Sequence, residues 1–232
     1  MTSLNIPRLI LIVTALTLAA PLVYGAGSGS MSGGGGTGVG ATTDAPRKTP
    51  QQMAVSSYNA GLNHKKRAQE YEEKAATAKN DQDRAKQLAK AKSQYEDAVD
   101  DYRKAIGYDK TAYQAMNELG YAYRKIGDYE NAVRAYNSAL LVKPDFAPAI
   151  EYRGEAYLAL SMFKDVKDAY LVLFGADQDQ AATLMRAMEA WQVLHQGDPA
   201  PEVKAFSDWV VERKAVAANT QSLSMNNVHA WN

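Results

Sequence analysis

Small and apolar residues recur along this chain at a fixed spacing of 34 residues. One set of six positions appears three times at that spacing: Tyr95, Ala98, Val99, Tyr102, Ala105 and Ile106, then Tyr129, Ala132, Val133, Tyr136, Ala139 and Leu140, then Phe163, Val166, Lys167, Tyr170, Leu173 and Phe174. Within each set the offsets place all six side chains on one face of a helix. The pattern therefore predicts a helix that is repeated once per unit.

A second helical stripe has the same period. It comprises Ala115, Met116, Leu119, Gly120, Ala122, Tyr123 and Ile126, which return as Ala149, Ile150, Arg153, Gly154, Ala156, Tyr157 and Leu160. Each unit is thus predicted to hold two helices, and Pro144 separates one unit from the next because proline cannot continue a helix interior. Glycine inside a helix costs about 1 kcal/mol relative to alanine, so Gly120 and Gly154 predict close approach of a partner helix.

The unit at residues 113–146 resembles the tetratricopeptide repeat. It has the family's residues at the family's spacing: Leu119, Gly120, Tyr123, Gly127, Tyr129, Ala132, Tyr136, Ala139 and Pro144. The unit at 147–180 is divergent: it keeps Gly154, Tyr157 and Tyr170 but has Arg153, Val166, Leu173 and Gln178 where the family has Leu, Ala, Ala and Pro. The resemblance implies an all-α, right-handed solenoid of about three helix hairpins, with seven or eight helices and no sheet.

The hairpin before these units, residues 51–112, is unusual. Its expected small residue, Gly61, lies 37 positions before Ala98, an excess of 25 over the usual spacing. The excess is rich in Ala, Lys and Glu and lacks Pro and Gly, a composition that favours helix. We therefore expect an elongated hairpin that turns near Asn80. The alternative is a separate additional helix before the repeats.

The end of such an array must cover its last apolar face. Two further stripes, which do not keep the spacing of 34, predict a pair of capping helices over 181–214: Leu184, Met188, Trp191 and Leu194, then Val203, Phe206, Trp209 and Val210. Residues 215–232, with a polar run over 219–227, are expected to form a flexible tail.

The first fifty residues predict no folded domain. Residues 1–26 have the pattern of a signal peptide, with Arg8, an apolar run from Leu9 to Ala20, and Pro21. Residues 27–50 form a glycine-rich segment that we expect to be a disordered linker. The chain is therefore expected to be exported. Because the chain has no cysteine and so no disulfides, we expect the bacterial periplasm rather than an animal extracellular space. Alternatively, an uncleaved signal would make it a membrane-anchored scaffold, which is the only membrane contact we expect.

Composition narrows the possible functions. The chain has 26 Lys and Arg against 26 Asp and Glu, a balance that argues against a nucleic-acid partner. Absence of cysteine excludes thiolate chemistry, and its three histidines show no metal-ligand spacing. We therefore expect no cofactor, no metal and no catalytic residue.

The family resemblance implies that the first helix of each unit lines a concave face. The residues expected to face inward there are Gln114, Asn117, Tyr121, Arg124 and Lys125, then Glu151, Glu155, Leu158 and Ala159. Such a mixture of polar groups would suit an extended peptide. One subfamily holds a C-terminal carboxylate with Lys and Asn at fixed inner positions, and the lysines here do not match that set. We expect a protein or peptide partner and a role as an adaptor or assembly factor in the bacterial cell envelope.

Three alternatives remain open for these surfaces. The inner face could simply be solvated. Recognition could instead lie on the elongated hairpin, where residues 64–92 carry nine Lys or Arg against five Asp or Glu, among them Lys65, Lys66 and Lys90. A third possibility is an accessory subunit of an envelope enzyme that uses Glu151 and Glu155, which share a helix face.

Overall fold

The structure is a computed structural model that describes residues 48–229. This range contains eight α-helices and no strand, which confirms the all-helical prediction. The expected signal peptide and all but the last three residues of the expected linker lie outside the described residues. Within the described range, no helix combines the length and apolar character needed to span a bilayer.

The helices follow one another with short connections. They are α1 (Pro50–Ala76), α2 (Asp81–Tyr108), α3 (Tyr113–Ile126), α4 (Tyr129–Val142), α5 (Ala147–Ala159), α6 (Phe163–Ala176), α7 (Gln178–Leu194) and α8 (Pro201–His229).

Local sequence sets several of these helix ends. Thr49 and Gln52 form a capping box before α1, with Pro50 in the first turn, so α1 begins one residue before the predicted hairpin. Asn80 caps α2 by accepting a hydrogen bond from the amide of Asp83. Gly127 ends α3 with a φ of 87°, a left-handed conformation that glycine adopts without steric cost.

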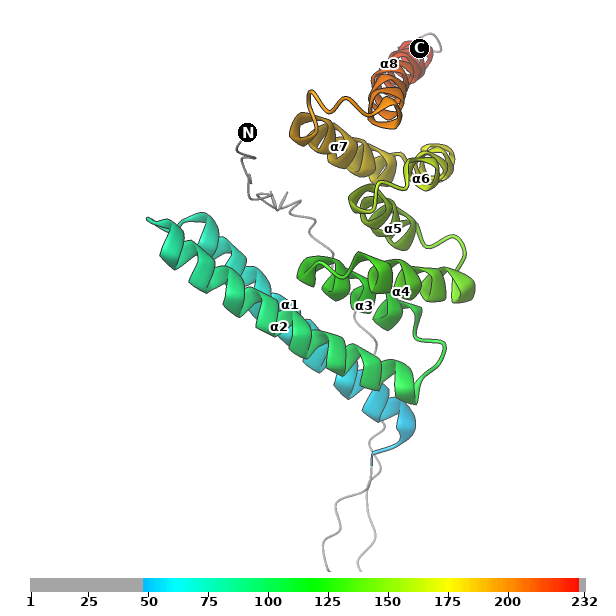
Figure 1. Ribbon diagram of the computed structural model, residues 1–232. Helices are drawn as coiled ribbons and strands as arrows, with labels where there is room; N and C mark the ends of the chain where they lie inside the picture. Colours follow the sequence, from blue (N-terminus) through cyan, green and yellow to red (C-terminus); the bar gives the residue numbers. More distant parts are fainter. Residues whose placement is uncertain (1–47, 230–232) are drawn as a thin grey trace, which may run out of the picture. The chain divides into compact units, whose positions relative to one another are not determined.

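Consecutive helices pack as hairpins, and the hairpins stack into a solenoid (Figure 1). α3 packs on α4 and α5 on α6, while α3, α5 and α7 also contact one another in succession. This arrangement confirms the predicted solenoid of helix hairpins. It makes α1, α3, α5 and α7 the inner helices of the stack.

The first hairpin is elongated, as the sequence predicted. α1 has 27 residues and α2 has 28, whereas the helices from α3 to α6 have 13 or 14. The turn falls just before Asn80, and the far end of the hairpin extends past α3 and α4 (Figure 1). Along α1 every buried residue is small: Ala54, Gly61, Ala68 and Ala75.

Two hydrophobic clusters form the core. The first joins α1 to α5 and is built mainly from alanine and tyrosine, with Tyr95, Tyr102 and Tyr136 fully buried. The second lies between α5 and α8 and contains larger aliphatic and aromatic residues, among them Leu184, Met188 and Phe206. The shift from Ala to bulkier side chains follows the divergence already visible in the unit at 147–180.

The predicted capping helices are present as α7 and α8. Trp191 packs edge-on against Phe206, and Trp209 packs edge-on against Tyr170 of α6. Leu194 differs from the prediction: it is the last residue of α7 and is exposed, because the chain turns away before a neighbour can cover it.

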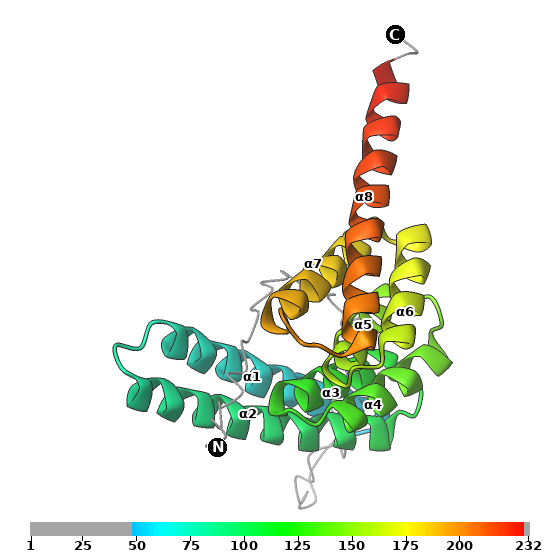
Figure 2. The ribbon, with the colours of Figure 1, turned by 45° about the horizontal axis from the view of Figure 1, so that its top comes forward.

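Residues 215–229 also differ from the sequence expectation of a flexible tail. α8 continues through them as helix to His229, and it projects beyond the other helices (Figure 2). Ala215, Ala217 and Ala218 have high helix propensity, which accounts for continuation of the helix past Lys214.

Candidate protein-binding surface

The residues predicted to face a ligand lie on the inner helices, but most of them are covered. Asn117 on α3 and Glu151 on α5 occupy equivalent positions in their units, and both are buried. Leu158 is buried within the second core cluster. Tyr121, Arg124, Lys125 and Glu155 are half-buried, while Ala159 at the end of α5 is exposed.

Ion pairs tie the inner helices to one another. Arg124 of α3 pairs with Glu155 of α5. Lys125 Nζ lies 2.6 Å from Glu72 Oε1 of α1, and Lys65 Nζ of α1 lies 2.7 Å from Glu118 Oε2 of α3. The three cations of this face thus already have partners within the chain. Their first role is to join α1, α3 and α5.

Tyr121 lies at the centre of this network. Lys65 Nζ is 4.3 Å from the centroid of its ring, and the Arg124 guanidinium is 5.4 Å from it. The same ring packs 6.1 Å from Tyr95 and 5.5 Å from Tyr152, measured between centroids. Tyr121, Arg124 and Glu155 therefore support the packing of neighbouring units.

Burial perturbs the ionisable groups of this face. Burial raises the pKa of Glu151 to about 7, and the charges of Arg124 and Arg186 only partly oppose that rise. Burial alone would lower the pKa of Lys65, but the charge and hydrogen bond of Glu118 raise it overall. Lys65 is therefore held as a cation, whereas the Glu151 carboxyl is protonated in a large fraction of molecules near neutral pH.

Glu151 and Glu155 do not form an accessible pair of carboxylates. Glu151 is only 1% exposed, and neither of its carboxylate oxygens has a hydrogen-bond partner among the described residues. Glu155 is paired with Arg124. In the described part of the chain, no cluster of His, Asp and Glu side chains is arranged to hold a metal ion.

One family model matches the sequence of α3 and α4. Residues 113–146 match the model of the tetratricopeptide repeat, so this helix pair has the sequence of one such repeat. The packing agrees with the signature: a Cβ on Gly120 would lie 2.5 Å from the ring of Tyr136, so this glycine is where the two helices of the repeat approach most closely.

Solved structures that resemble the chain include several with tetratricopeptide repeats. The second such domain of human RPAP3, in complex with an HSP70 peptide, is 17% identical, covers 69% of this chain and 97% of its own, and has a TM-score of 0.39. The first repeat domain of Spaghetti (RPAP3), bound to an HSP90 peptide, is 18% identical over 57% of this chain and 94% of its own, with a TM-score of 0.41. MamA is 17% identical over 75% and 95%, with a TM-score of 0.42.

No curated protein matches the sequence.

The glycine of the unit after the repeat has a different neighbour. A Cβ on Gly154 would lie 2.7 Å from a methyl group of Leu184 on α7, not against the tyrosine of its own unit. Next to it, Arg153 Nη1 donates to Asn137 Oδ1 of α4 at 2.6 Å, so this arginine points away from the core that the family's leucine would join. These departures from the family pattern therefore lie where α7 packs against Gly154 of α5.

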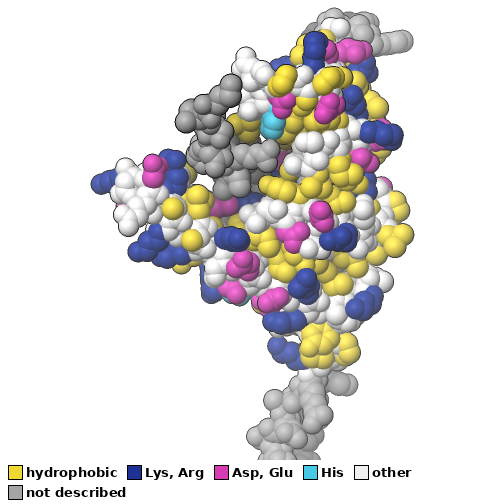
Figure 3. Space-filling view, viewed as in Figure 1, with side chains coloured by type: hydrophobic (Ala, Val, Ile, Leu, Met, Phe, Trp, Pro, Cys, Tyr) yellow, Lys and Arg dark blue, Asp and Glu magenta, His cyan; other side chains and the backbone are white. Residues whose placement is uncertain are grey.

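The elongated hairpin presents a basic surface outside the repeat. Lys66, Arg67, Lys86 and Lys92 are exposed and have no ion-pair partner among the described residues, and Figure 3 shows dark-blue side chains around the end of this hairpin. Lys65 was predicted to belong to this basic surface, but its side chain is half-buried and pairs with Glu118. Recognition by this hairpin would therefore depend on Lys66 and its exposed neighbours.

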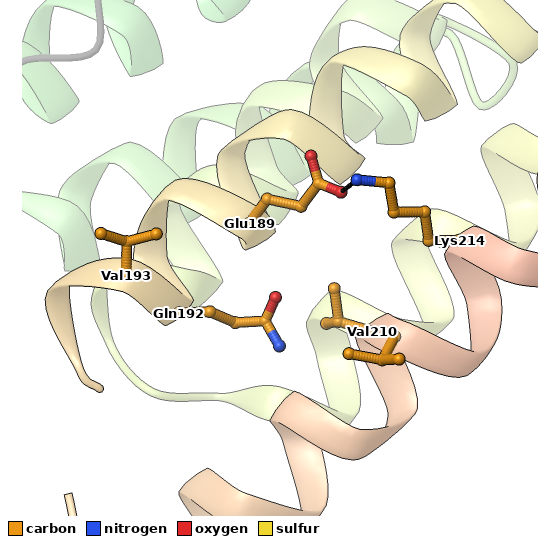
Figure 4. A pocket seen from close by; sticks show the side chains of 6 residues that line it. Glu189, Gln192, Val193, Val210 and Lys214 are labelled. Atoms are coloured by element: carbon orange, nitrogen blue, oxygen red, sulfur yellow. Dashed lines mark ion pairs between the residues drawn. The ribbon is translucent and has the colours of Figure 1, made fainter. Parts of the chain in front are cut away.

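The sequence did not predict a groove that lies between α7 and α8. It is lined by Glu189, Gln192, Val193, Val210, Val211 and Lys214 (Figure 4). The sequence could have indicated this groove through Val193 and Val211, which are apolar but lie outside the two capping stripes. The groove lies at the end of the stack, away from the inner face of the repeat.

Proposed function

We propose that this chain is a non-catalytic protein-interaction module that acts as an adaptor or assembly factor in the bacterial cell envelope. The observation that carries the proposal is the tetratricopeptide repeat of α3 and α4, set in a stack of helix hairpins. A stacked array of this kind offers extended surfaces that suit binding of another chain. Relatives by fold include proteins whose structures hold HSP70 and HSP90 peptides.

The geometry favours a partner that lies along the inner helices over one that replaces their ion pairs. Because Lys65, Arg124 and Lys125 are already paired, a ligand would gain little by supplying a carboxylate to them. The pairs instead hold a rigid face with half-buried aromatic rings, a composition typical of protein interfaces. An extended segment with apolar and hydrogen-bonding side chains fits this face better than an acidic terminus.

Photocrosslinking from defined positions tests the binding face. A photoreactive amino acid is placed at Gln114 or Ala159 on the inner helices, and as a matched control at Ser138 or Lys164, which are exposed on α4 and α6. With bacterial envelope extract, we expect a partner to be captured from the inner positions and not from the outer ones. Equal capture from both faces, or capture from the outer face alone, would disprove binding on the inner face.

Export rests on the sequence of residues 1–26 and is tested separately. Fractionation of bacteria expressing the full chain should place it in the periplasm, and mass spectrometry of its N-terminus should begin near residue 27. Recovery with the membrane and an intact residue 1 would instead support an anchored scaffold. Recovery in the cytoplasm would refute export.

A further inference from the structure

Charge is distributed unevenly between the first hairpin and the rest of the chain. Residues 48–92, which include α1 and the first part of α2, contain ten Lys or Arg against five Asp or Glu, whereas residues 93–229 contain 14 against 20. The zero net charge of the whole chain therefore combines a basic hairpin with an acidic remainder. Because the hairpin extends past α3 and α4, the basic residues near its turn are held away from the acidic helices (Figure 1).

Two of the cations on α1 lie on the side of this helix that faces away from α3. Lys65 and Glu72 face α3, where both form ion pairs. Residues two positions apart lie about 200° apart around a helix. Arg67, two positions after Lys65, and Lys74, two positions after Glu72, therefore lie on the opposite side of α1.

The ring of Tyr71 joins the two helices on this side of the hairpin. Lys74 Nζ of α1 lies 5.1 Å from the ring centroid, and Lys90 Nζ of α2 lies 5.4 Å from it. Lys86 precedes Lys90 by four residues and therefore lies on the same side of α2. Four exposed cations here have no ion-pair partner among the residues that the structure describes: Arg67, Lys74, Lys86 and Lys90. These four residues and Tyr71 form the basic face.

The nearby carboxylates lie mainly to either side of the basic face. Asp97 and Asp101 lie nearer the base of the hairpin, where their Oδ2 atoms are 3.6 and 3.7 Å from the ring nitrogens of His64. Glu70 and Glu73 lie on the side of α1 opposite its buried alanines. The positive charge of the basic face is therefore available to an anion outside the chain.

The composition of the basic face favours phospholipid headgroups over another protein. Protein interfaces are depleted of lysine and have apolar or aromatic centres. Three of the four cations here are lysines, and no large apolar side chain is exposed between residues 56 and 107. Clusters of about four to eight Lys or Arg are instead typical of proteins that bind anionic membrane surfaces, where each cation adds about fivefold to the affinity.

We propose that the basic face docks the chain onto an anionic phospholipid bilayer. The outer surface of two packed helices suits a flat layer of phosphate groups, and the face looks away from α3. The net negative charge of residues 93–229 is repelled by the same lipids, which orients the chain with the hairpin toward the membrane. Such docking needs no membrane-spanning helix, is distinct from an anchor at residues 1–26, and does not depend on a partner bound to the inner helices.

Cosedimentation with lipid vesicles measures this docking. Residues 48–232 form a compact unit of their own, so they can be measured without the apolar run at 9–20, which would itself enter lipid. We expect binding to vesicles made of equal parts of phosphatidylglycerol and phosphatidylcholine, and none to vesicles of phosphatidylcholine alone. Raising the salt from about 0.1 M to about 1 M should release the protein, because the Debye length falls from about 10 Å to about 3 Å.

Charge reversal tests whether the basic face is the part that binds. The double variant Lys74→Glu, Lys90→Glu should weaken binding to the anionic vesicles at least about tenfold. A second double variant, Arg67→Glu with Lys86→Glu, leaves both lysines at the Tyr71 ring in place and should weaken binding by a similar factor. Circular dichroism verifies that each variant is folded.

The double variant Lys164→Glu, Lys204→Glu is the matched control. It makes the same change of net charge at exposed positions on α6 and α8, and it should leave vesicle binding nearly unchanged. Equal weakening by the control, unchanged binding in both variants of the basic face, or a parent chain that does not bind the anionic vesicles would each overturn the proposal. Binding to polyglutamate in place of the vesicles would also overturn it and would assign this surface to an acidic protein.

Discussion

The backbone of Gly61 lies directly against the ring of Tyr102. A Cβ at Gly61 would come within 2.5 Å of that ring, the same distance that separates a Cβ at Gly120 from the ring of Tyr136. The two contacts are equivalent: Tyr102 and Tyr136 are 34 residues apart, and the glycines differ by 34 plus the 25 inserted residues. The elongated hairpin therefore packs at its base as the tetratricopeptide repeat does.

This contact predicts a matched loss of stability. Gly61→Ala and Gly120→Ala should each lower the free energy of unfolding by about 1–3 kcal/mol, because both rings are buried and cannot move aside. Urea denaturation followed by circular dichroism measures the effect. Gly107→Ala is the control: nothing lies within 4 Å of its Cβ position, so alanine should stabilise α2 by about 0.5–1 kcal/mol. Similar changes at all three sites would contradict close packing at Gly61 and Gly120.

A second pair of positions one period apart allows a reciprocal test. Ser161 has a φ of 57°, and it lies 34 residues after Gly127, whose φ is 87°. Left-handed backbone costs a residue with a side chain about 1 kcal/mol. Ser161→Gly should therefore stabilise the fold by about 0.5–1 kcal/mol, while Gly127→Ser should destabilise it by a similar amount. If Ser161→Gly lowers stability in thermal or urea denaturation, the strain assigned to this turn is wrong.

The buried carboxyl of Glu151 should make stability depend on pH. Its pKa is raised from 4.5 to about 7, so the folded state keeps a proton that the unfolded state has lost between these values. Stability from this group is therefore fully present below pH 4.5 and falls as pH rises to about 7. Glu151→Gln should remove this fall, and at pH 8 the variant should be more stable than the parent by about 3 kcal/mol.

Urea denaturation of both proteins from pH 4 to pH 8 checks this expectation. Glu130→Gln on the exposed face of α4 serves as the control and should have the same pH dependence as the parent. Parallel curves for the parent and Glu151→Gln would show that Glu151 ionises normally in the folded protein.

The ion pairs of the inner face should contribute more to the free energy of unfolding than those on the outer face. Lys125 and Glu72 have side chains only 11% and 9% exposed, and the Glu72 carboxylate also accepts a hydrogen bond from the Tyr95 hydroxyl. A double-mutant cycle with Lys125→Met and Glu72→Gln should give a coupling energy of about 1–3 kcal/mol. The exposed pair Lys164–Asp168 should give less than about 0.5 kcal/mol in the same measurement. Equal coupling in the two cycles would mean that the inner pair does not hold α1 to α3.

The spacing of 34 was sufficient to predict the hairpins because a helix pair that repeats must bury the same stripe each time. Gly61 departs from this spacing by 25 residues and was identified instead because only a small residue can occupy the point of closest approach. The positions of Asn117 and Glu151 on the inner helices followed from the same register. These predictions depend on local periodicity alone, which the sequence displays directly.

The inner face could not be predicted to the same depth, because its ion pairs join residues far apart in the chain. Lys125 meets Glu72, 53 residues earlier, only because the inserted residues place Glu72 opposite α3. No periodic pattern in the sequence predicts that ion pair. The helical continuation of α8 was missed for a different reason: polar residues over 219–227 suggested a loop, while the alanines before them favour helix.

The buried residues of α1, Ala54, Gly61, Ala68 and Ala75, follow one another every seven positions, and Ala91, Ala98 and Ala105 do the same on α2. This is the heptad of a coiled coil, in which each added or removed heptad leaves the facing seam in register. The hairpin can therefore lengthen or shorten by seven residues on each helix while the contact of Gly61 with Tyr102 stays in place. Its reach, about 10 Å for each heptad, can vary through evolution or by design without disturbing the stack that carries it.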